Sequence, residues 1–441
     1  MSRQEREILA IGAGPGNLGL AVALEELAPK ELAGDTLIVE QHDNVLWQRG
    51  MLLPWTQSQV SFLKDLVTLR NPCSRFSFIS YLHSVGRLDE FINLGSFLPY
   101  RMEISGYLSW VCGSLRHVRV EFGRRCVSVA LREAHDGRVT GWLVRFADGG
   151  EIVCRTLVVG AGRDPNVPVE LSLLPRRRVI HSTEFAARVA ELDPDPPRRV
   201  VVIGGAQSAA EMLWAAHQRF PRAHCAIVMR SIGLNNYQSS KFTNELFYPS
   251  FVDEFYAARP EARDQLLREM HRTNYSGLAP QLLDALYREM YLERLTGTER
   301  LQMVTMTDVT DAAMDGEEVV LTLVDRKSGR ARQLRCDVVL LGTGFVNRMP
   351  KLVRDLAAAV DLDEVTVDRN YRMSLPDRVA ADCYLQGVNE ATHGIADSLL
   401  SVLAMRAGEI VSDLLARRHP PGLHQPGSQQ PAPATAGALE P

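Results

Sequence analysis

Two glycine-rich turns carry the clearest chemistry in this sequence, and the first is GAGPGN. It supplies Gly12 for a tight turn and Gly14 for close approach of the backbone to a pyrophosphate, while Asn17 replaces the usual third glycine. The helix that follows offers free N–H groups to phosphates. The next strand ends in Glu40, which is placed to hydrogen-bond a ribose hydroxyl. Together these features indicate a dinucleotide site rather than an unrelated glycine turn.

The second turn lies in GGAQSAAE, where Ala206 follows Gly205 at the position of a further fingerprint glycine. Gln207 and Ser208 come next and can donate hydrogen bonds to phosphate. The strand after this helix carries no acid at its end, and Arg230 stands there instead. A guanidinium at this point suits a 2′-phosphate, so the pattern favours NADP over NAD. A solvated surface arginine is the alternative.

The third feature is a lysine inside an apolar stretch, QVSFLKDLVTLRNP, which contains Lys64 followed by Asp65. A buried ammonium needs an anion, because an unpaired charge is costly away from water. A substrate carboxylate could supply that anion. A salt bridge to a neighbouring acid, or a side chain that reaches solvent, is the alternative.

The elements that must position these residues form two strand–helix–strand units. Strand, glycine turn, helix and strand occur in that order at 7–41 and again at 198–231. The pattern is helical over 251–296 and over 392–418, and 317–345 reads as a hairpin followed by a buried strand. The tail after residue 418 is rich in Pro, Gly and Gln, which predicts disorder over 419–441.

Composition excludes several classes of function. The chain has 441 residues, enough for two or three domains, and a formal charge of −4 gives no reason to expect nucleic acid or an anionic membrane as partner. No apolar run is long enough to span a bilayer, and the polar N-terminus leads directly into a strand. Seven scattered cysteines without a Cys-x-x-Cys pair favour a cytoplasmic location and exclude a disulfide reductase.

Two dinucleotide sites, the second biased to NADP, indicate a flavoprotein that NADPH reduces. Without a redox cysteine pair, a monooxygenase or a simple reductase remains. In a monooxygenase, reduced flavin captures oxygen as a hydroperoxide, and a nucleophilic substrate attacks its distal oxygen. The protein must then exclude water, since the hydroperoxide otherwise decays to peroxide.

Several longer motifs are similar to one family. They are GAGPGNLGLAVALEE, MLLPWTQSQVSFLKDLVTLRNP, FSFISYLH, GGAQSAAE, FTNELFYP, RTNYSGL and THGIADSLLSVLA. In this order they resemble the flavin-dependent amine N-hydroxylases of siderophore biosynthesis, the L-ornithine and L-lysine N-monooxygenases, from about residue 8 to about residue 415. The resemblance implies FAD, NADPH and O2, no metal, and a homo-oligomer, either tetramer or dimer.

The same resemblance implies an α/β fold with two Rossmann-like dinucleotide-binding domains, for FAD and NADPH, and a small helical substrate-binding region. The expected division assigns 1–165 and 336–418 to FAD, 166–235 and 300–335 to NADPH, and 236–299 to the helical region. Gln48 stands where the family often has histidine.

Site residues are implied position by position. The expected FAD contacts are Gly12, Gly14, Gly16, Asn17, Glu40, Trp47, Gln48, Gln59, Val127, Ser398, Leu399 and Leu400. The expected NADP contacts are Gly205, Ala206, Gln207, Ser208, Arg230, Asn274, Tyr275 and Ser276. The expected substrate contacts are Lys64, Asn244, Glu245, Leu246, Phe247, Asn274 and Ser401. The candidate catalytic residues are Asn274 and Gln59.

The implied reaction is N-hydroxylation of the side-chain amine of L-ornithine through a C4a-hydroperoxyflavin. The amine must be neutral to attack, and desolvation lowers its pKa from about 10.4. Asn274 could accept a hydrogen bond from this amine, with a helix or turn cap as its alternative role. No role is assigned to Asp65, Asp397 or His393.

Substrate choice is less determined. One methylene contributes only about 1–3 kcal/mol of discrimination, so L-lysine remains an alternative to L-ornithine. HRTNYSGL resembles the ornithine branch. A diamine such as putrescine or cadaverine would leave Lys64 without its carboxylate. More distant alternatives are a Baeyer–Villiger or sulfur-oxidising flavin monooxygenase, and a non-catalytic nucleotide sensor.

Overall fold

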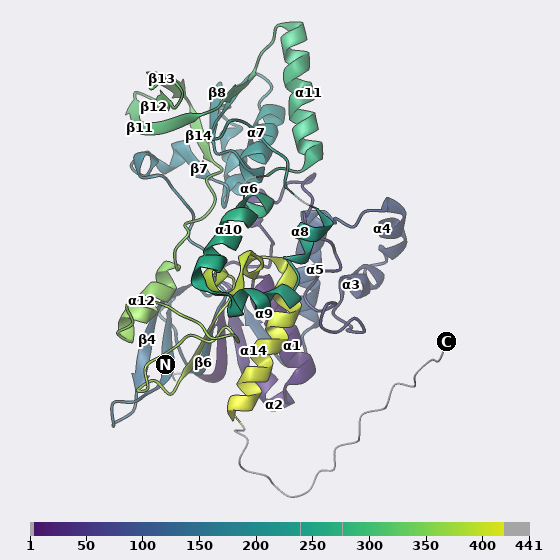
Figure 1. The fold of residues 1–441 in the computed structure, drawn as a ribbon, viewed down its shortest axis with the longest axis vertical. Coiled ribbons are helices and arrows are strands. Elements are labelled where there is room, and N and C mark those ends of the chain that lie inside the picture. The colour runs from purple at the N-terminus through teal and green to yellow at the C-terminus, as the bar shows by residue number, and fades with distance from the viewer. Residues whose placement is uncertain (1–3, 239, 276, 419–441) are drawn as a thin grey trace, which may run out of the picture.

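The computed structural model describes residues 4–238, 240–275 and 277–418. The expected disordered tail, 419–441, therefore lies outside the described residues, and so does Ser276. Two lobes follow one another along the long axis of the molecule (Figure 1). Each lobe contains one of the two strand–glycine turn–helix units, as the sequence predicts.

The first lobe is built on a seven-stranded sheet with the order β3-β2-β1-β6-β5-β4, and β15 also pairs with β6. Its strands are β1 (Gln4–Ile11), β2 (Thr36–Val39), β3 (Arg119–Glu121), β4 (Cys126–Glu133), β5 (Val139–Phe146), β6 (Glu151–Val159) and β15 (Asp382–Leu385). β1 pairs in parallel with β2 and β6, in the registers Ile11↔Val39 and Ile11↔Val159. These three strands therefore end together, at the edge where the first glycine turn begins.

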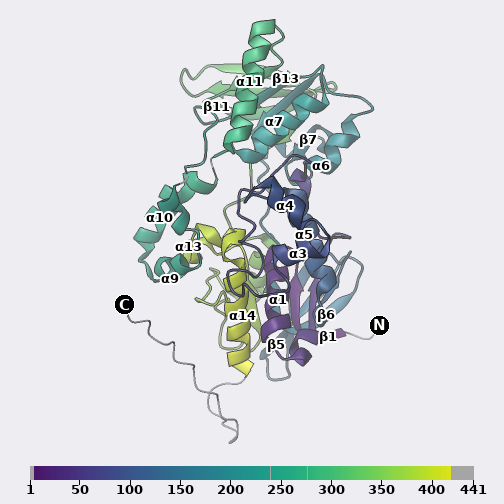
Figure 2. The same ribbon diagram turned by 90° about the vertical axis from the view of Figure 1, so that its right-hand side faces the viewer.

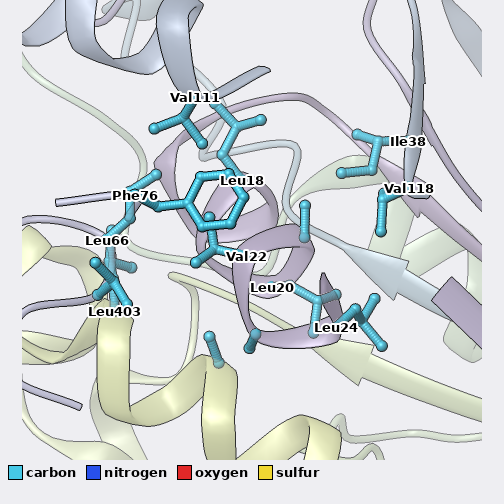
Figure 3. Close-up of a cluster of buried hydrophobic side chains, with 14 of the residues drawn as sticks. Leu18, Leu20, Val22, Leu24, Ile38, Leu66, Phe76, Val111, Val118 and Leu403 are labelled. Carbon is cyan, nitrogen blue, oxygen red and sulfur yellow. The ribbon is translucent and has the colours of Figure 1, made fainter. Parts of the chain in front are cut away.

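Helices α1 (Pro15–Leu27), α5 (Arg101–Ser114) and α14 (Leu403–Arg418) form the main helical layer of this lobe (Figure 1). α1 is apolar on nearly every face because it is enclosed, and Leu18 and Val22 are fully buried. Figure 3 shows these two side chains beside Phe76 and Leu403, which come from a loop and from α14. Truncating such a leucine to alanine typically costs about 2–5 kcal/mol, so this cluster anchors the first glycine turn.

The second lobe is built on a five-stranded parallel sheet with the order β10-β9-β8-β14-β7. Its strands are β7 (Val179–His181), β8 (Arg199–Ile203), β9 (His224–Val228), β10 (Leu301–Val304) and β14 (Val338–Leu341). A three-stranded antiparallel sheet adjoins it, made of β11 (Thr307–Asp315), β12 (Glu318–Asp325) and β13 (Ala331–Cys336). α7 (Gln207–Arg219) and α11 (Pro280–Thr296) pack on the five-stranded sheet.

Two boundaries of the expected division differ from this architecture. β14 lies in the second sheet between β7 and β8, although 336–418 was expected in the first domain. Its buried VVLL segment fills the gap between two parallel strands, which a sequence pattern alone does not reveal. α11 was expected in the helical region 236–299, but its Leu282 and Leu286 belong to the same apolar core as α7.

A helical segment lies beside the junction of the two lobes (Figure 2). It comprises α8 (Lys241–Glu245), α9 (Ser250–Ala257) and α10 (Pro260–Asn274). α13 (Glu390–His393) contacts α9 and α10, and so connects the segment to the first lobe. The remaining helices are α2 (Lys30–Gly34), α3 (Phe78–Ser84), α4 (Leu88–Leu94), α6 (Phe185–Arg188) and α12 (Lys351–Ala359). Among the described helices, none has the length and apolar character needed to cross a bilayer.

Candidate functional site

A single cavity of about 2770 Å³ connects the two glycine turns. It opens at the carboxyl ends of the parallel strands in both lobes, the edge at which such folds bind their ligands. Gly14 lines one end and Gly205 the other, while Lys64 and Asn274 line the part between them. The cavity therefore has room for two dinucleotides and a small substrate in contact with one another.

The first glycine turn is shaped as a dinucleotide requires. Gly12 has φ +92°, and a Cβ there would lie 2.7 Å from the carbonyl oxygen of Gly160. A Cβ on Gly14 would meet no described atom within 4 Å, so this point faces open space. Asn17 is not among the lining residues; its Nδ2 donates to the carbonyl oxygens of Ile11 at 3.0 Å and Gly12 at 2.7 Å. Asn17 thus fixes the backbone of the turn through these two hydrogen bonds.

The walls of this end fit a flavin dinucleotide. Glu40 follows β2 and accepts from the backbone N–H of Ala13 at 2.8 Å and of His42 at 3.0 Å. Gln48 takes a left-handed backbone conformation, φ +50°, which is uncommon for a residue with a Cβ. The buried Oε1 of Gln386 has no hydrogen-bond partner among the described residues, and it lines the cavity near Gly16. An orphaned acceptor of this kind suits a polar ligand edge.

The other expected flavin contacts also line this cavity. They are Gly16, Trp47, Gln59, Val127, Ser398, Leu399 and Leu400. The side-chain oxygen of Gln59 accepts a hydrogen bond from the hydroxyl of Tyr237, a residue that sequence reasoning did not single out. Tyr237 lies just after the second unit, so this contact also joins the two lobes.

The second glycine turn is built like the first. α7 begins at Gln207, and no side chain in the described part of the chain caps its N-terminus. Gly205, Ala206 and Ser208 line the cavity there. The side chain of Gln207 is already engaged, because its Nε2 donates to Glu211 and its Oε1 accepts from the backbone of Ala279, both at 2.8 Å. A phosphate at this turn would therefore be bound by backbone N–H groups and Ser208.

Lys64 is half-buried and lies at the cavity wall. Its Nζ is 3.3 Å from the hydroxyl of Ser401 and 4.4 Å from the ring centroid of Tyr248. Burial lowers the pKa of this lysine. Among the described residues no carboxylate lies within ion-pair distance of it, so the alternative of a salt bridge to a neighbouring acid does not apply. Ser401 is buried, which makes the pair a fixed feature of the wall.

Asp65, unlike Lys64, makes its contacts within its own loop and with Phe78. One of its carboxylate oxygens accepts from the backbone N–H groups of Val67 and Thr68, and the other accepts from the hydroxyl of Thr68 and the N–H of Phe78. This carboxylate therefore fixes the loop that carries Lys64.

The remaining substrate candidates divide into two groups. Asn244 and Phe247 line the cavity, as does Asn274 at the end of α10. Glu245 and Leu246 belong to the same short segment but are not among the lining residues. One turn of helix cannot point all its side chains to one side, so the four-residue contact implied for 244–247 is only half realised.

Glu390 was not anticipated. Its carboxylate accepts from the hydroxyls of Tyr275 and Ser398, the latter at 2.7 Å, and it pairs with Arg163 at 2.9 Å. Burial, together with the charge of Glu390, raises the pKa of Tyr275 to about 12, so this hydroxyl remains a donor near neutral pH. No motif marks Glu390, because its three partners come from three separate segments of the chain.

Asp397 and His393 both make contacts within the protein. Asp397 is buried, pairs with Arg406 at 2.9 Å, and accepts from the backbone N–H of Asn389. His393 stacks on Tyr371 at 4.1 Å between ring centroids, and burial lowers its pKa.

One cluster away from the cavity has the residue types of a metal site. His217, Glu289 and Glu293 offer ligand atoms within 4.8 Å of one another. The guanidinium of Arg300 lies 3.1 Å from His217 and 3.5 Å from Glu293, so a positive charge of the protein already lies within this cluster.

Comparison with known proteins agrees with this arrangement. A model of the L-lysine 6-monooxygenase/L-ornithine 5-monooxygenase family matches residues 4–347. The L-ornithine N(5)-monooxygenase of Pseudomonas aeruginosa is 34% identical over 414 residues, which cover 92% of this chain and 93% of the relative.

Two solved structures extend this likeness to the fold. The ornithine hydroxylase PvdA from Pseudomonas aeruginosa has a TM-score of 0.86 at 35% identity, covering 93% of this chain and 98% of that one. The Kutzneria sp. 744 ornithine N-hydroxylase, in the form KtzI-FADred-NADP+-L-orn, also has a TM-score of 0.86, at 34% identity, covering 94% of this chain and 100% of that one.

Proposed function

Because the chain belongs to the L-lysine 6-monooxygenase/L-ornithine 5-monooxygenase family, we propose that it hydroxylates the side-chain amine of L-ornithine with NADPH and O2, using FAD. A role in making hydroxamate siderophores or related natural products follows from this activity. The observation that carries the proposal is the single cavity in which an unpaired Lys64 ammonium lies between two dinucleotide turns. The seven-stranded-sheet lobe would hold FAD, and the five-stranded-sheet lobe would hold NADPH.

Lys64 would bind the α-carboxylate of the amino acid. Its ammonium has a hydroxyl and an aromatic ring as neighbours but no acid, so it offers a free charge to an incoming anion. Asn244 lines the same part of the cavity and would add a hydrogen bond. Fixing this end of the substrate leaves the side chain to extend toward the flavin.

The distal amine would be held in its neutral form. The surroundings that lower the pKa of Lys64 would lower that of a second amine too, because burial disfavours any ammonium. Asn274 would accept a hydrogen bond from the amine without attracting a positive charge strongly. Bound FAD supplies the oxygen-transfer chemistry and NADPH the hydride. The protein's part is to orient the amine, keep it neutral and exclude water.

The assembly and location are further parts of the proposal. The family resemblance supports a homo-oligomer, tetramer or dimer. Seven cysteines free of disulfides support a reducing compartment, the cytoplasm.

The direct test uses purified enzyme loaded with FAD. NADPH oxidation and hydroxylamine formation are measured in parallel with L-ornithine, L-lysine, putrescine and a sulfide. Hydroxylated ornithine as the main product supports the proposal. Hydroxylated lysine or putrescine as the main product would change the substrate assignment. NADPH consumption that yields only peroxide with every amine would overturn the proposed hydroxylation.

A further inference from the structure

Arg230 lies in the loop after β9. This residue lines the cavity at the end beyond the second glycine turn, and it makes no ion pair with any described residue. Residues at the start of β11 donate backbone hydrogen bonds to both sequence neighbours of Arg230. Thr307 N–H donates to the carbonyl oxygen of Met229 at 3.0 Å, and Met306 N–H donates to that of Ser231 at 2.9 Å. Arg230 is thereby held against the three-stranded sheet.

The same hydrogen bonds bring an acid to the cavity. Asp308 follows Thr307 and lines the cavity together with Arg230. An acid at this edge of a dinucleotide fold normally binds the ribose 2′-hydroxyl of NAD, and it repels the 2′-phosphate of NADP. On its own, Asp308 would therefore oppose the coenzyme that Arg230 favours, or would pair with Arg230 and occupy it.

Arg326, however, pairs with Asp308. Its Nε donates to one carboxylate oxygen of Asp308 and its Nη2 to the other, both at 2.7 Å. Its backbone N–H donates to the carbonyl oxygen of Met306 at 2.7 Å, which ties its position to the Arg230 loop. Arg326 is not among the lining residues, so it binds the Asp308 carboxylate from the side away from the cavity.

We propose that Arg326 is a positioning residue that withholds Asp308 from Arg230 and so makes this end of the cavity selective for an adenosine 2′-phosphate. The inference rests on the proposed NADPH-dependent function and deepens it. The hydrogen bond from Arg326 lowers the pKa of Asp308, and the charge of Arg230 also lowers it, which agrees with the three groups acting on one another. An exposed ion pair of this kind contributes little to stability.

The test compares two probes that differ by the 2′-phosphate alone. Binding of adenosine 2′,5′-bisphosphate and of 5′-AMP to the FAD-loaded enzyme is measured by isothermal titration calorimetry, without substrate or turnover. Arg326→Ala should weaken the bisphosphate about ten-fold and 5′-AMP less than about two-fold, since an acid a few ångströms from the phosphate is then unpaired. The Asp308→Asn/Arg326→Ala double variant should recover most of the lost affinity.

Two further variants complete the design. Asp308→Asn alone should bind the bisphosphate at least as well as the wild type, because the acid is gone and Arg230 remains. Arg335→Ala removes an arginine with the same kind of pairing on the same small sheet, to Asp315 at 2.7 Å and Glu318 at 3.2 Å, away from the cavity lining. This control should change neither affinity.

The inference is overturned if Arg326→Ala weakens both probes equally or neither, or if the double variant fails to recover. It is also overturned if wild-type enzyme binds the two probes alike. None of these measurements involves ornithine. A protein that behaves as expected here and yet hydroxylates no amine would therefore contradict the proposed function and leave this inference standing.

Discussion

Arg101 of α5 and Glu211 of α7 form a two-point ion pair across the junction of the lobes, with N–O distances of 2.8 and 2.7 Å. Arg101 is 5% exposed and Glu211 1% exposed, so the pair is closed off from water. Arg101 also donates to the carbonyl oxygen of Met51, and Gln207 donates to Glu211. The first turn of α7, where NADP is expected, is thereby fixed relative to the FAD lobe.

Glu211→Gln should destabilise the protein strongly. The substitution leaves the Arg101 guanidinium buried without its counter-charge, a change that typically costs about 3–5 kcal/mol. Tm measured by calorimetry should fall by several degrees. Arg219→Gln is the matched control, since Arg219 lies on the same helix and pairs with Asp193 at the surface, and its loss should move Tm little. Equal effects of the two variants would contradict a special role for the buried pair.

Gly50→Ala should slow flavin reduction by NADPH. A Cβ on Gly50 would overlap the backbone of Ser182 and Thr183, which approach from the other lobe, so the lobes must shift apart. A displacement of about 1 Å between reacting groups can cost about a hundred-fold in rate. The rate is followed as loss of flavin absorbance in anaerobic stopped flow.

Gly113→Ala is the control for this variant. Gly113 lies on α5, and a Cβ there would meet no described atom within 4 Å, so the change should leave the reduction rate unaltered. It should also raise stability by up to about 1 kcal/mol, as alanine does in a helix. Unchanged reduction in Gly50→Ala would show that the lobes tolerate the shift.

Lys64→Met should raise the apparent KM for ornithine. The variant keeps the length of the side chain and removes the charge, and a lost charged contact typically costs about 2–3 kcal/mol, or roughly thirty- to two-hundred-fold. Flavin reduction by NADPH alone should be largely spared. Lys241→Met on the exposed side of α8 provides a charge-matched control with no expected change. Unaltered ornithine kinetics in Lys64→Met would remove this lysine from the site.

The pH dependence of amino-acid binding should report the lowered pKa of Lys64. Only the ammonium form attracts a carboxylate, so affinity is full below this pKa and is lost as pH rises through it. Because burial lowers the pKa, the loss should begin below the ordinary lysine value of about 10.4. The dissociation constant of L-norvaline, which lacks a side-chain amine, is measured against pH.

Lys64→Arg is the comparison for the pH series. A guanidinium keeps its charge to a pH above about 12, so the variant should hold its affinity where the wild type begins to lose it. Titration of the norvaline α-amine is common to both proteins and cancels in the comparison. Parallel curves for the two proteins would rule out Lys64 as the titrating group.

The sequence by itself determined both glycine turns, the acid after the first unit and the arginine after the second. These features depend on backbone angles and side-chain volume within a few residues, as at Gly12, whose φ of +92° is one that glycine adopts readily. Local patterns also gave the helices over 251–296, because periodic apolar residues mark a buried face whatever it packs against.

Only the tertiary structure decided which distant residues meet. Lys64 and Ser401 are 337 positions apart in the sequence. Asp308 and Arg230 line the same part of the cavity only because the residues before Asp308 donate backbone hydrogen bonds to the residues on either side of Arg230. Likewise, β14 joins the second sheet because a parallel strand is placed by its neighbours in space. Such contacts depend on how whole elements pack, and a pattern confined to neighbouring residues carries no record of that packing.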